Sequence, residues 1–160
     1  MVIDTNVPVV ANGMHPPASL ECREACIATL KAARLSVVIL DDESRILDEY
    51  RRHLSHSGQP GLGDAFFKWL WDNQGNPARC RRVPITSIRG SDRNFAEFPA
   101  DPDLDGFDPS DRKFVAVAIA SGVNPTIHNA SDRDWADFRA PLTRYVVINF
   151  ICPDLMLVAP

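Results

Sequence analysis

Several features that would place this chain of 160 residues in a specialised class are missing from its sequence. No apolar run approaches the roughly 20 residues that a helix needs to cross a bilayer, so we expect no membrane span. Asp4 interrupts the apolar start and no basic segment precedes it, so we predict no secretory signal. No internal repeat or low-complexity tract occurs. These absences favour a single globular domain in the cytoplasm.

Cysteine is scarce, and its spacing predicts no metal centre. The chain has four cysteines: Cys22, Cys26, Cys80 and Cys152. No Cys-x-x-Cys sequence or Cys/His pairing accompanies them, and cytoplasmic thiols stay reduced. Cys22 and Cys26 are spaced to share a helix face, yet we expect small apolar core residues there rather than zinc ligands.

The chain also lacks an excess of positive charge. Its net charge of −4 argues against a protein that holds nucleic acid by bulk electrostatics. A nuclease is not excluded, because bound divalent cations offset a carboxylate cluster locally. Basic residues do cluster at Arg51-Arg52 and at Arg79, Arg81 and Arg82. These basic residues either line a groove that binds the phosphate backbone of a nucleic acid or, as is commoner, form a solvated surface.

Apolar periodicity and capping residues predict alternating strands and helices. The expected strands are 1–4, 36–40, 125–128 and 145–151, with a short edge strand at 83–88. The expected helices are 20–34, 43–56, 62–72, a helix opened by Asp108 and Pro109, and a turn at 132–138; 8–18 and most of 73–108 are expected to be loop. This alternation predicts a three-layer α/β/α domain with a largely parallel central sheet.

Three acidic residues are expected to face one edge of that sheet. Asp4 directly follows the first strand and Asp132 follows the strand 125–128, and ligands of open α/β sheets gather beyond the carboxyl ends of strands. Asp111 shares a helix face with Val115 and Ala118, which directs it into the fold. Asp111 also fits the third position of a capping box, and both interpretations can hold together.

A fourth acid lies on the helix 43–56. Ile46, Tyr50 and Leu54 recur at four-residue steps and should be buried. Glu49 lies at the border of that stripe, whereas Asp48 lies further toward solvent. Periodicity alone favours Glu49 over Asp48 as the inward acid only slightly, and an ordinary solvated glutamate is an equal alternative at this point.

In order and spacing, these acids resemble the four acidic motifs of PIN-domain nucleases. The motifs are Ile3-Asp4-Thr5-Asn6, Ile46-Leu47-Asp48-Glu49-Tyr50, Asp111-Arg112-Lys113-Phe114-Val115-Ala116-Val117-Ala118 and Ser131-Asp132-Arg133-Asp134-Trp135. The resemblance covers residues 1–151 as one PIN-like domain and leaves 152–160 as a C-terminal tail. The segment 58–107, with its helix and long loop, matches no part of the family pattern.

The resemblance implies a strand order of 3-2-1-4-5 and a metal-dependent endoribonuclease. Carboxylates that converge need a cation between them, and oxygen ligands select Mg²⁺ or Mn²⁺. Catalytic metal ligands are expected at Asp4, Glu49, Asp111 and Asp132; Asp134 belongs to the same metal site, and Thr5 and Asn6 orient the others. PIN nucleases mostly cut single-stranded RNA, and many, like the VapC toxins, pair with an antitoxin. We therefore expect an RNA substrate, an antitoxin protein and a homodimer.

Other classes fit less well. A dehalogenase-type phosphotransferase needs a second aspartate two residues after the first, where this chain has Asn6. A receiver-like phosphoacceptor needs an acid pair near the start, which the chain lacks. A non-catalytic PIN-like module that binds RNA or protein stays open. The ring-bearing residues Phe66, Phe67, Trp69 and Trp71 are either core or a partner-binding surface.

Overall fold

Strands and helices alternate along the chain in the computed structural model, which describes residues 1–91 and 93–152. The strands are β1 (Val2–Ile3), β2 (Val38–Asp41), β3 (Cys80–Val83), β4 (Thr126–Asn129) and β5 (Val147–Phe150). The α-helices are α1 (Asn6–Ala11), α2 (Leu20–Ala33), α3 (Arg45–His53), α4 (Leu62–Asn73), α5 (Arg112–Ala120), α6 (Arg133–Asp137) and α7 (Arg139–Leu142), with a 3₁₀ turn η1 at Pro102–Leu104. The predicted tail beyond residue 152 lies outside the described residues.

The strands form two parallel groups that meet at Met1. β4 pairs in parallel with both β1 and β5, and β2 pairs in parallel with β3. The Ile39 N–H donates to the Met1 carbonyl at 2.9 Å, and the Met1 ammonium donates to the Val37 carbonyl at 2.8 Å. These bonds place β2 beside β1, so the strands follow one another in the order β3-β2-β1-β4-β5. The predicted adjacency of the first and fourth strands is confirmed.

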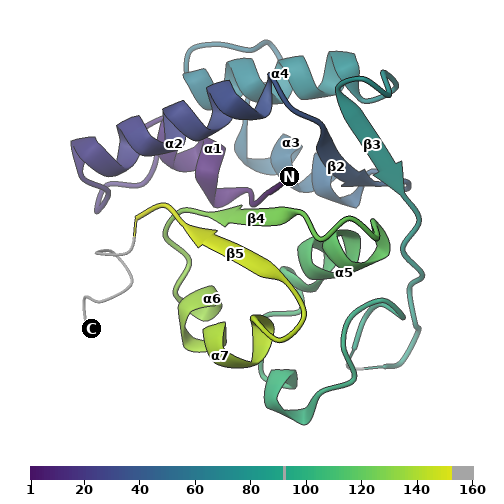
Figure 1. The fold of residues 1–160 in the computed structure, drawn as a ribbon. Helices are drawn as coiled ribbons and strands as arrows, with labels where there is room; N and C mark the ends of the chain where they lie inside the picture. Colours follow the sequence, from purple (N-terminus) through teal and green to yellow (C-terminus); the bar gives the residue numbers. More distant parts are fainter. Residues whose placement is uncertain (92, 153–160) are drawn as a thin grey trace.

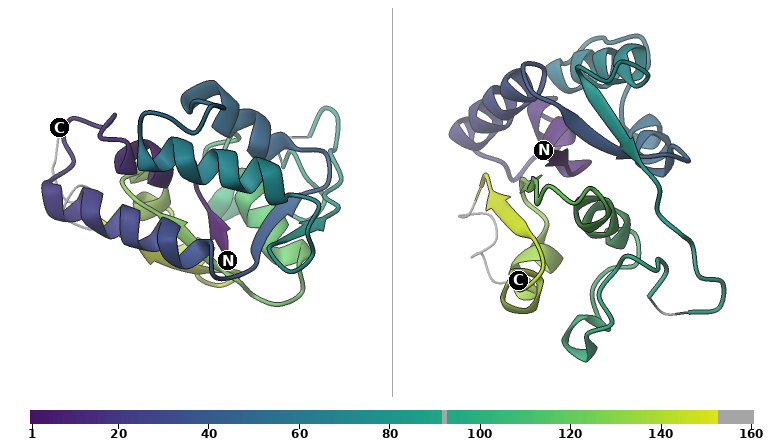
Figure 2. Two further views of the ribbon diagram at one scale, coloured as in Figure 1. Left: turned by 90° about the horizontal axis from the view of Figure 1, so that it is seen from above. Right: turned by 45° about the vertical axis from the view of Figure 1, so that its right-hand side comes forward.

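Helices lie against the strands on more than one side. Figure 1 shows α2 and α4 above β4 and β5, with α6 and α7 below them. α1, α2 and α4 contact one another, and Figure 2 shows α2 beside α4 from above. α5 contacts β1, β2 and β4, and its residues 112–118 are all buried. The chain is thus a mixed α/β protein with parallel strand pairing.

The expected loop at 8–18 is wrong in its first part, where the chain forms α1. Pro8 is the third helical residue after the N-cap Thr5, a position whose backbone N–H has no intrahelical partner in any case. α1 then packs closely on α4: a Cβ at Gly63 would lie 2.0 Å from the Pro8 carbonyl oxygen. Asn12 Oδ1 accepts from Gly63 N at 2.7 Å and so satisfies the amino end of α4. These contacts fix the segment that follows Asp4.

Two predicted boundaries also move. β3 is at Cys80–Val83 instead of 83–88, because Cys80 and Val83 are the residues buried beside β2. The helix expected from Asp108 begins only at Arg112. Residues 108–111 form a turn instead, in which Asp108 Oδ1 accepts from Ser110 N at 2.7 Å.

The aromatic residues of α4 do not form one exposed surface. Phe66 and Phe67 are fully buried, and their rings pack against Tyr50 of α3. Trp69 and Trp71 are half-buried against the same core. The predicted partner surface is therefore wrong for the two phenylalanines, because α4 uses them to cover α3.

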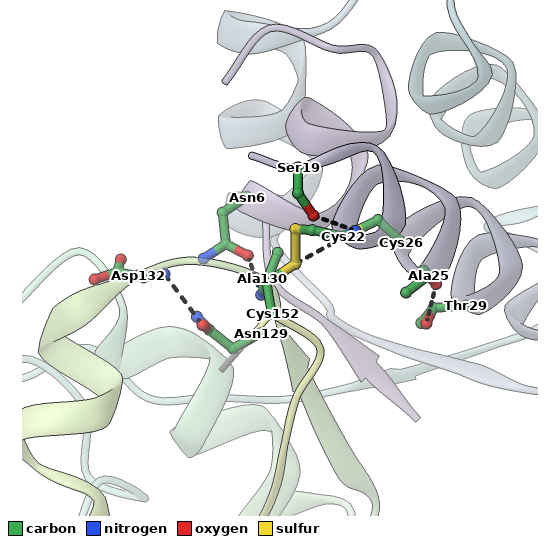
Figure 3. Close-up of a disulfide and its surroundings, with 10 residues drawn as sticks. All are labelled: Asn6, Ser19, Cys22, Ala25, Cys26, Thr29, Asn129, Ala130, Asp132 and Cys152. Atoms are coloured by element: carbon green, nitrogen blue, oxygen red, sulfur yellow. Dashed lines mark hydrogen bonds between the residues drawn. A yellow bond between two sulfur atoms is a disulfide. The ribbon is translucent and has the colours of Figure 1, made fainter. Parts of the chain in front are cut away.

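The expectation that every thiol is reduced is wrong for Cys22 and Cys152, which form a disulfide across 130 residues of sequence (Figure 3). Ser19 caps α2 by accepting from Cys22 N at 3.1 Å, and Cys152 follows β5, so the bond clamps α2 to the end of the sheet. Cys26 and Cys80 are free and buried. Cys26 Sγ lies 4.0 Å from Cys152 Sγ. Across the described residues, no helix has the length and apolar character to span a membrane.

Candidate functional site

A pocket of about 260 Å³ lies where β1 ends, bounded by side chains from α3, the start of α5 and the segment after β4. Its lining residues are Asp4, Thr5, Asn6, Val9, Glu49, His53, Ser110, Asp111 and Asp132. The structure thus brings together all the predicted site residues except one. Asp134 is half-buried outside the lining, and its backbone N–H donates to Asp132 Oδ1 at 2.9 Å.

A larger hollow of about 840 Å³ lies elsewhere, near the amino ends of the strands. Its lining includes Met1, Val37, Cys80 and Pro125 and contains no acidic side chain. Size alone would favour this hollow as the site. Catalysis needs convergent ionisable groups, and these are found in the smaller pocket.

Asp4 is held at the centre of the pocket and is almost inaccessible to solvent, with 3% exposure. Its Oδ1 accepts from Asn6 N at 3.0 Å, and its Oδ2 accepts from Asn129 Nδ2 at 3.3 Å. Burial raises the pKa of Asp4 to about 7, and the charges of Asp132 and Glu49 add to the increase. Asp4 therefore holds a proton over part of the neutral range when no cation is near.

Asp111 is buried at the amino end of α5. Its Oδ2 accepts from Trp135 Nε1 at 3.1 Å. Burial raises the pKa of Asp111 to about 9, with smaller increases from the charges of Asp4, Asp132 and Asp108. The capping-box interpretation is wrong here, because the Asp111 side chain makes no capping bond.

Asp132 has two roles in the structure. It lines the pocket, and it caps α6 through the bond to Asp134 N. Burial raises the pKa of Asp132, the hydrogen bond from the Asp134 backbone N–H lowers it, the charge of Asp134 raises it, and a side-chain hydrogen bond to Asp111 lowers it. Asn129 Oδ1 accepts from Asp132 N at 3.2 Å, so this fully buried amide joins Asp132 to Asp4.

Glu49 faces the pocket and Asp48 faces solvent. The Glu49 side chain is 17% exposed and accepts a hydrogen bond from Thr5 Oγ1 at 2.5 Å. Asp48 is 46% exposed and pairs with Arg51 at 3.0 Å on the surface of α3. Of the two neighbouring acids on α3, Glu49 is therefore the one that lines the pocket.

The structure adds partners that the sequence reasoning missed. Lys113 forms an ion pair with Glu49, and Asn129 connects two of the acids. A lysine at the start of an otherwise apolar helix was the available signal for Lys113. For Asn129 the signal was an amide at a strand end.

Asn6 holds an orphaned donor next to the acids. Its Oδ1 accepts from Ala130 N at 2.8 Å, which joins the segment after β1 to the end of β4 (Figure 3). Its Nδ2 is buried and has no hydrogen-bond partner among the described residues. A buried amide of this kind is costly unless an acceptor completes it, so it fits a bound phosphate oxygen or water.

The donor set fits a hard divalent cation by chemistry, because every candidate ligand is a carboxylate oxygen. The carboxylate oxygens of these acids nevertheless lie too far apart for three of them to hold one ion as they stand. Within residues 1–91 and 93–152, the only group of three or more Cys, His, Asp or Glu ligand atoms within 4.8 Å of one another is Cys22, Cys26 and Cys152. Bringing three carboxylates onto one ion thus requires side-chain rotation.

The metal-free protein is expected to lose stability as pH rises. Asp4 and Asp111 have folded pKa values of about 7 and about 9, above the ordinary value near 4, so the folded state keeps protons that the unfolded chain releases. Their stabilising contribution is complete below about pH 4 and is lost as pH rises through about 7 and then about 9. Thermal melts in EDTA across this range, for the wild type and Asp111→Asn, measure the effect. The variant should show a flatter curve, and equal slopes would contradict the assignment.

Comparison with known proteins found no match to this chain among the family models, the curated proteins or the solved structures.

Proposed function

We propose that this protein is a divalent-metal-dependent endoribonuclease with a three-layer PIN-like architecture. One observation carries the proposal: Asp4, Glu49, Asp111 and Asp132 come from four separate parts of the chain and line one pocket. Carboxylates gathered in this way repel one another, and a bound cation relieves that repulsion. The order of the acidic motifs gives independent support through their resemblance to PIN nucleases.

The chemistry follows from the four acids. Asp4, Glu49, Asp111 and Asp132 would hold Mg²⁺ or Mn²⁺, with Asp134 supporting Asp132 through its backbone N–H. The metal, when bound, supplies an activated water and stabilises the charge on a phosphodiester. Asn6 offers its free Nδ2 to a substrate oxygen, while Thr5 and Asn129 fix the acids in place. Because their pKa values are raised, Asp4 and Asp111 would have to release their protons before they could hold a cation.

The substrate and partners belong to the same proposal. By the PIN resemblance, the substrate is single-stranded RNA. By the same resemblance, the chain acts in the cytoplasm as a toxin-type nuclease, forms a homodimer and binds an antitoxin that covers the pocket. The Cys22–Cys152 disulfide is the feature that argues against a reducing compartment.

A second function is favoured by one specific observation. Lys113 already neutralises Glu49 inside the pocket, so the site is partly balanced without a metal. A PIN-like module that binds RNA or protein without cutting it would keep such a pair. Metal-dependent activity separates the two functions.

Cleavage of end-labelled RNA decides between them. We expect internal cuts in single-stranded RNA with Mn²⁺ or Mg²⁺, no cuts with EDTA, and slower cutting of a matched duplex. Asp111→Asn provides the inactive control, because Trp135 Nε1 can still donate to the amide oxygen. RNA binding with no metal-dependent cleavage across a varied panel would favour the non-catalytic module.

A further inference from the structure

Lys113 places an ammonium group inside the acidic pocket. Its side chain is only 8% exposed, and its Nζ contacts a Glu49 carboxylate oxygen and the Ser110 carbonyl oxygen. The same Nζ lies 4.7 Å from the centre of the Phe114 ring. A buried ammonium is tolerated only when it is paired and hydrogen-bonded, and these contacts supply both conditions.

Glu49 is occupied by this arrangement at both of its oxygens. Oε1 accepts from Thr5 Oγ1 at 2.5 Å, and Oε2 pairs with Lys113. A cation bound to Glu49 would have to share these oxygens with Thr5 and Lys113. It would also lie next to a buried ammonium, where like charges repel strongly because solvent screening is weak.

Among the described residues, Lys113 forms no ion pair with the other three acids, although its charge lowers the pKa of Asp4 and of Asp111. Asp4, Asp111 and Asp132 accept from backbone N–H groups, an amide and an indole, and Asp111 and Asp132 also share a side-chain hydrogen bond. None of these donors is charged. Of the four pocket acids, Asp4 and Asp111 have the least solvent exposure. Among the described residues, Glu49 is therefore the pocket acid that pairs directly with Lys113, and the raised pKa values of Asp4 and Asp111 leave these two acids largely protonated until a cation binds.

We propose that Lys113 occupies the place of a second metal ion, so that each chain binds one divalent cation through Asp4, Asp111 and Asp132. Glu49 then stays bound to Lys113 and Thr5 and serves as a positioning residue. Through the Ser110 carbonyl and Glu49, Lys113 also ties the turn before α5 to α3. This inference rests on the proposed function and revises the role of Glu49 within it.

Calorimetric titration with Mn²⁺, supported by equilibrium dialysis, tests the stoichiometry on metal-free protein. We expect one ion per chain for the wild type and two for Lys113→Met, because the variant frees Glu49. Lys68→Met is the matched control: Lys68 is 49% exposed on α4 and pairs with Asp72, and its loss should leave one ion. Two ions in the wild type, or one in Lys113→Met, would overturn the inference and leave the proposed nuclease standing. No ion in the wild type would overturn both.

A double variant keeps the test decisive if Lys113→Met fails to fold. Lys113→Met combined with Glu49→Gln removes both charges together, which avoids a buried unpaired carboxylate. We expect this protein to bind one Mn²⁺ with a dissociation constant within a few-fold of the wild type. Loss of binding in a folded double variant would show that Glu49 is a metal ligand and that the inference is wrong.

Discussion

Asp4→Asn is expected to reduce metal-dependent RNA cleavage by more than about 100-fold. Changes to residues that only support a metal ligand typically cost roughly 10–100-fold, and Asp4 is proposed to touch the ion itself. Asparagine has the same shape and can still accept from Asn6 N, so the fold should survive. Initial rates with Mn²⁺ on a labelled single-stranded RNA measure the effect.

Asp48→Asn is the matched control for that experiment, because Asp48 is exposed and pairs only with Arg51 among the described residues. Its activity should stay within a few-fold of the wild type.

Melting curves give a second measurement on Asp4→Asn. In EDTA the variant should melt above the wild type, because it removes an acid that burial and nearby Asp132 and Glu49 disfavour in its charged form.

With Mn²⁺ the order of the melting temperatures should reverse. The wild type gains about 2.7 kcal/mol when the metal is at 100 times its dissociation constant, and the variant gains little. If Mn²⁺ shifts neither protein, the pocket holds no metal and the nuclease proposal is wrong. If Mn²⁺ stabilises the wild type but RNA stays intact, the metal has another use.

Reduction of the Cys22–Cys152 disulfide is expected to lower the free energy of unfolding by about 4–5 kcal/mol. The bond closes a loop of 130 residues, and a loop of this size strongly restricts the unfolded chain. Urea unfolding with and without a reductant measures the loss. Cys152→Ser should resemble the reduced wild type and should not respond to reductant. A wild type that is equally stable in both conditions would contradict the prediction.

Cys22→Ser should cost less than Cys152→Ser, because Cys26 can replace the missing partner. Cys26 Sγ lies 4.0 Å from Cys152 Sγ, and both thiols are on residues with little exposure. In oxidised glutathione the variant should form a Cys26–Cys152 bond, which peptide mapping identifies. Recovery of only the free thiols would show that the two residues cannot approach further.

Local sequence signals determined much of the framework. Ser19 caps α2 where the sequence predicts a helix start, and the bounds of α4 differ from the prediction by one residue. Asp4 follows β1 and Asp132 follows β4, so parallel pairing of these strands could be expected to bring their ends together. Strand alternation, capping and apolar periodicity are short-range properties, and the sequence displays them directly.

Helix α1 and the delayed start of α5 needed the tertiary structure. Pro8 and the prolines after it indicate a loop by composition, yet packing of α1 against Gly63 of α4 stabilises a helix there. The opposite happens at Asp108, where a good capping sequence forms a turn instead. Local preference is worth little energy at such sites, and packing overrides it.

For the pocket too, the sequence predicted some of the residues and only the tertiary structure revealed the others. The acids themselves were readable from their positions after strands and on a helix face. Their partners were not: Lys113 meets Glu49 across 64 residues, Asn129 meets Asp4 across 125, and Cys22 meets Cys152 across 130. Pairing over such separations leaves no periodic trace, because it depends on how whole elements pack. The sequence by itself therefore determined which residues could do chemistry, and only the tertiary structure decided which charges they face.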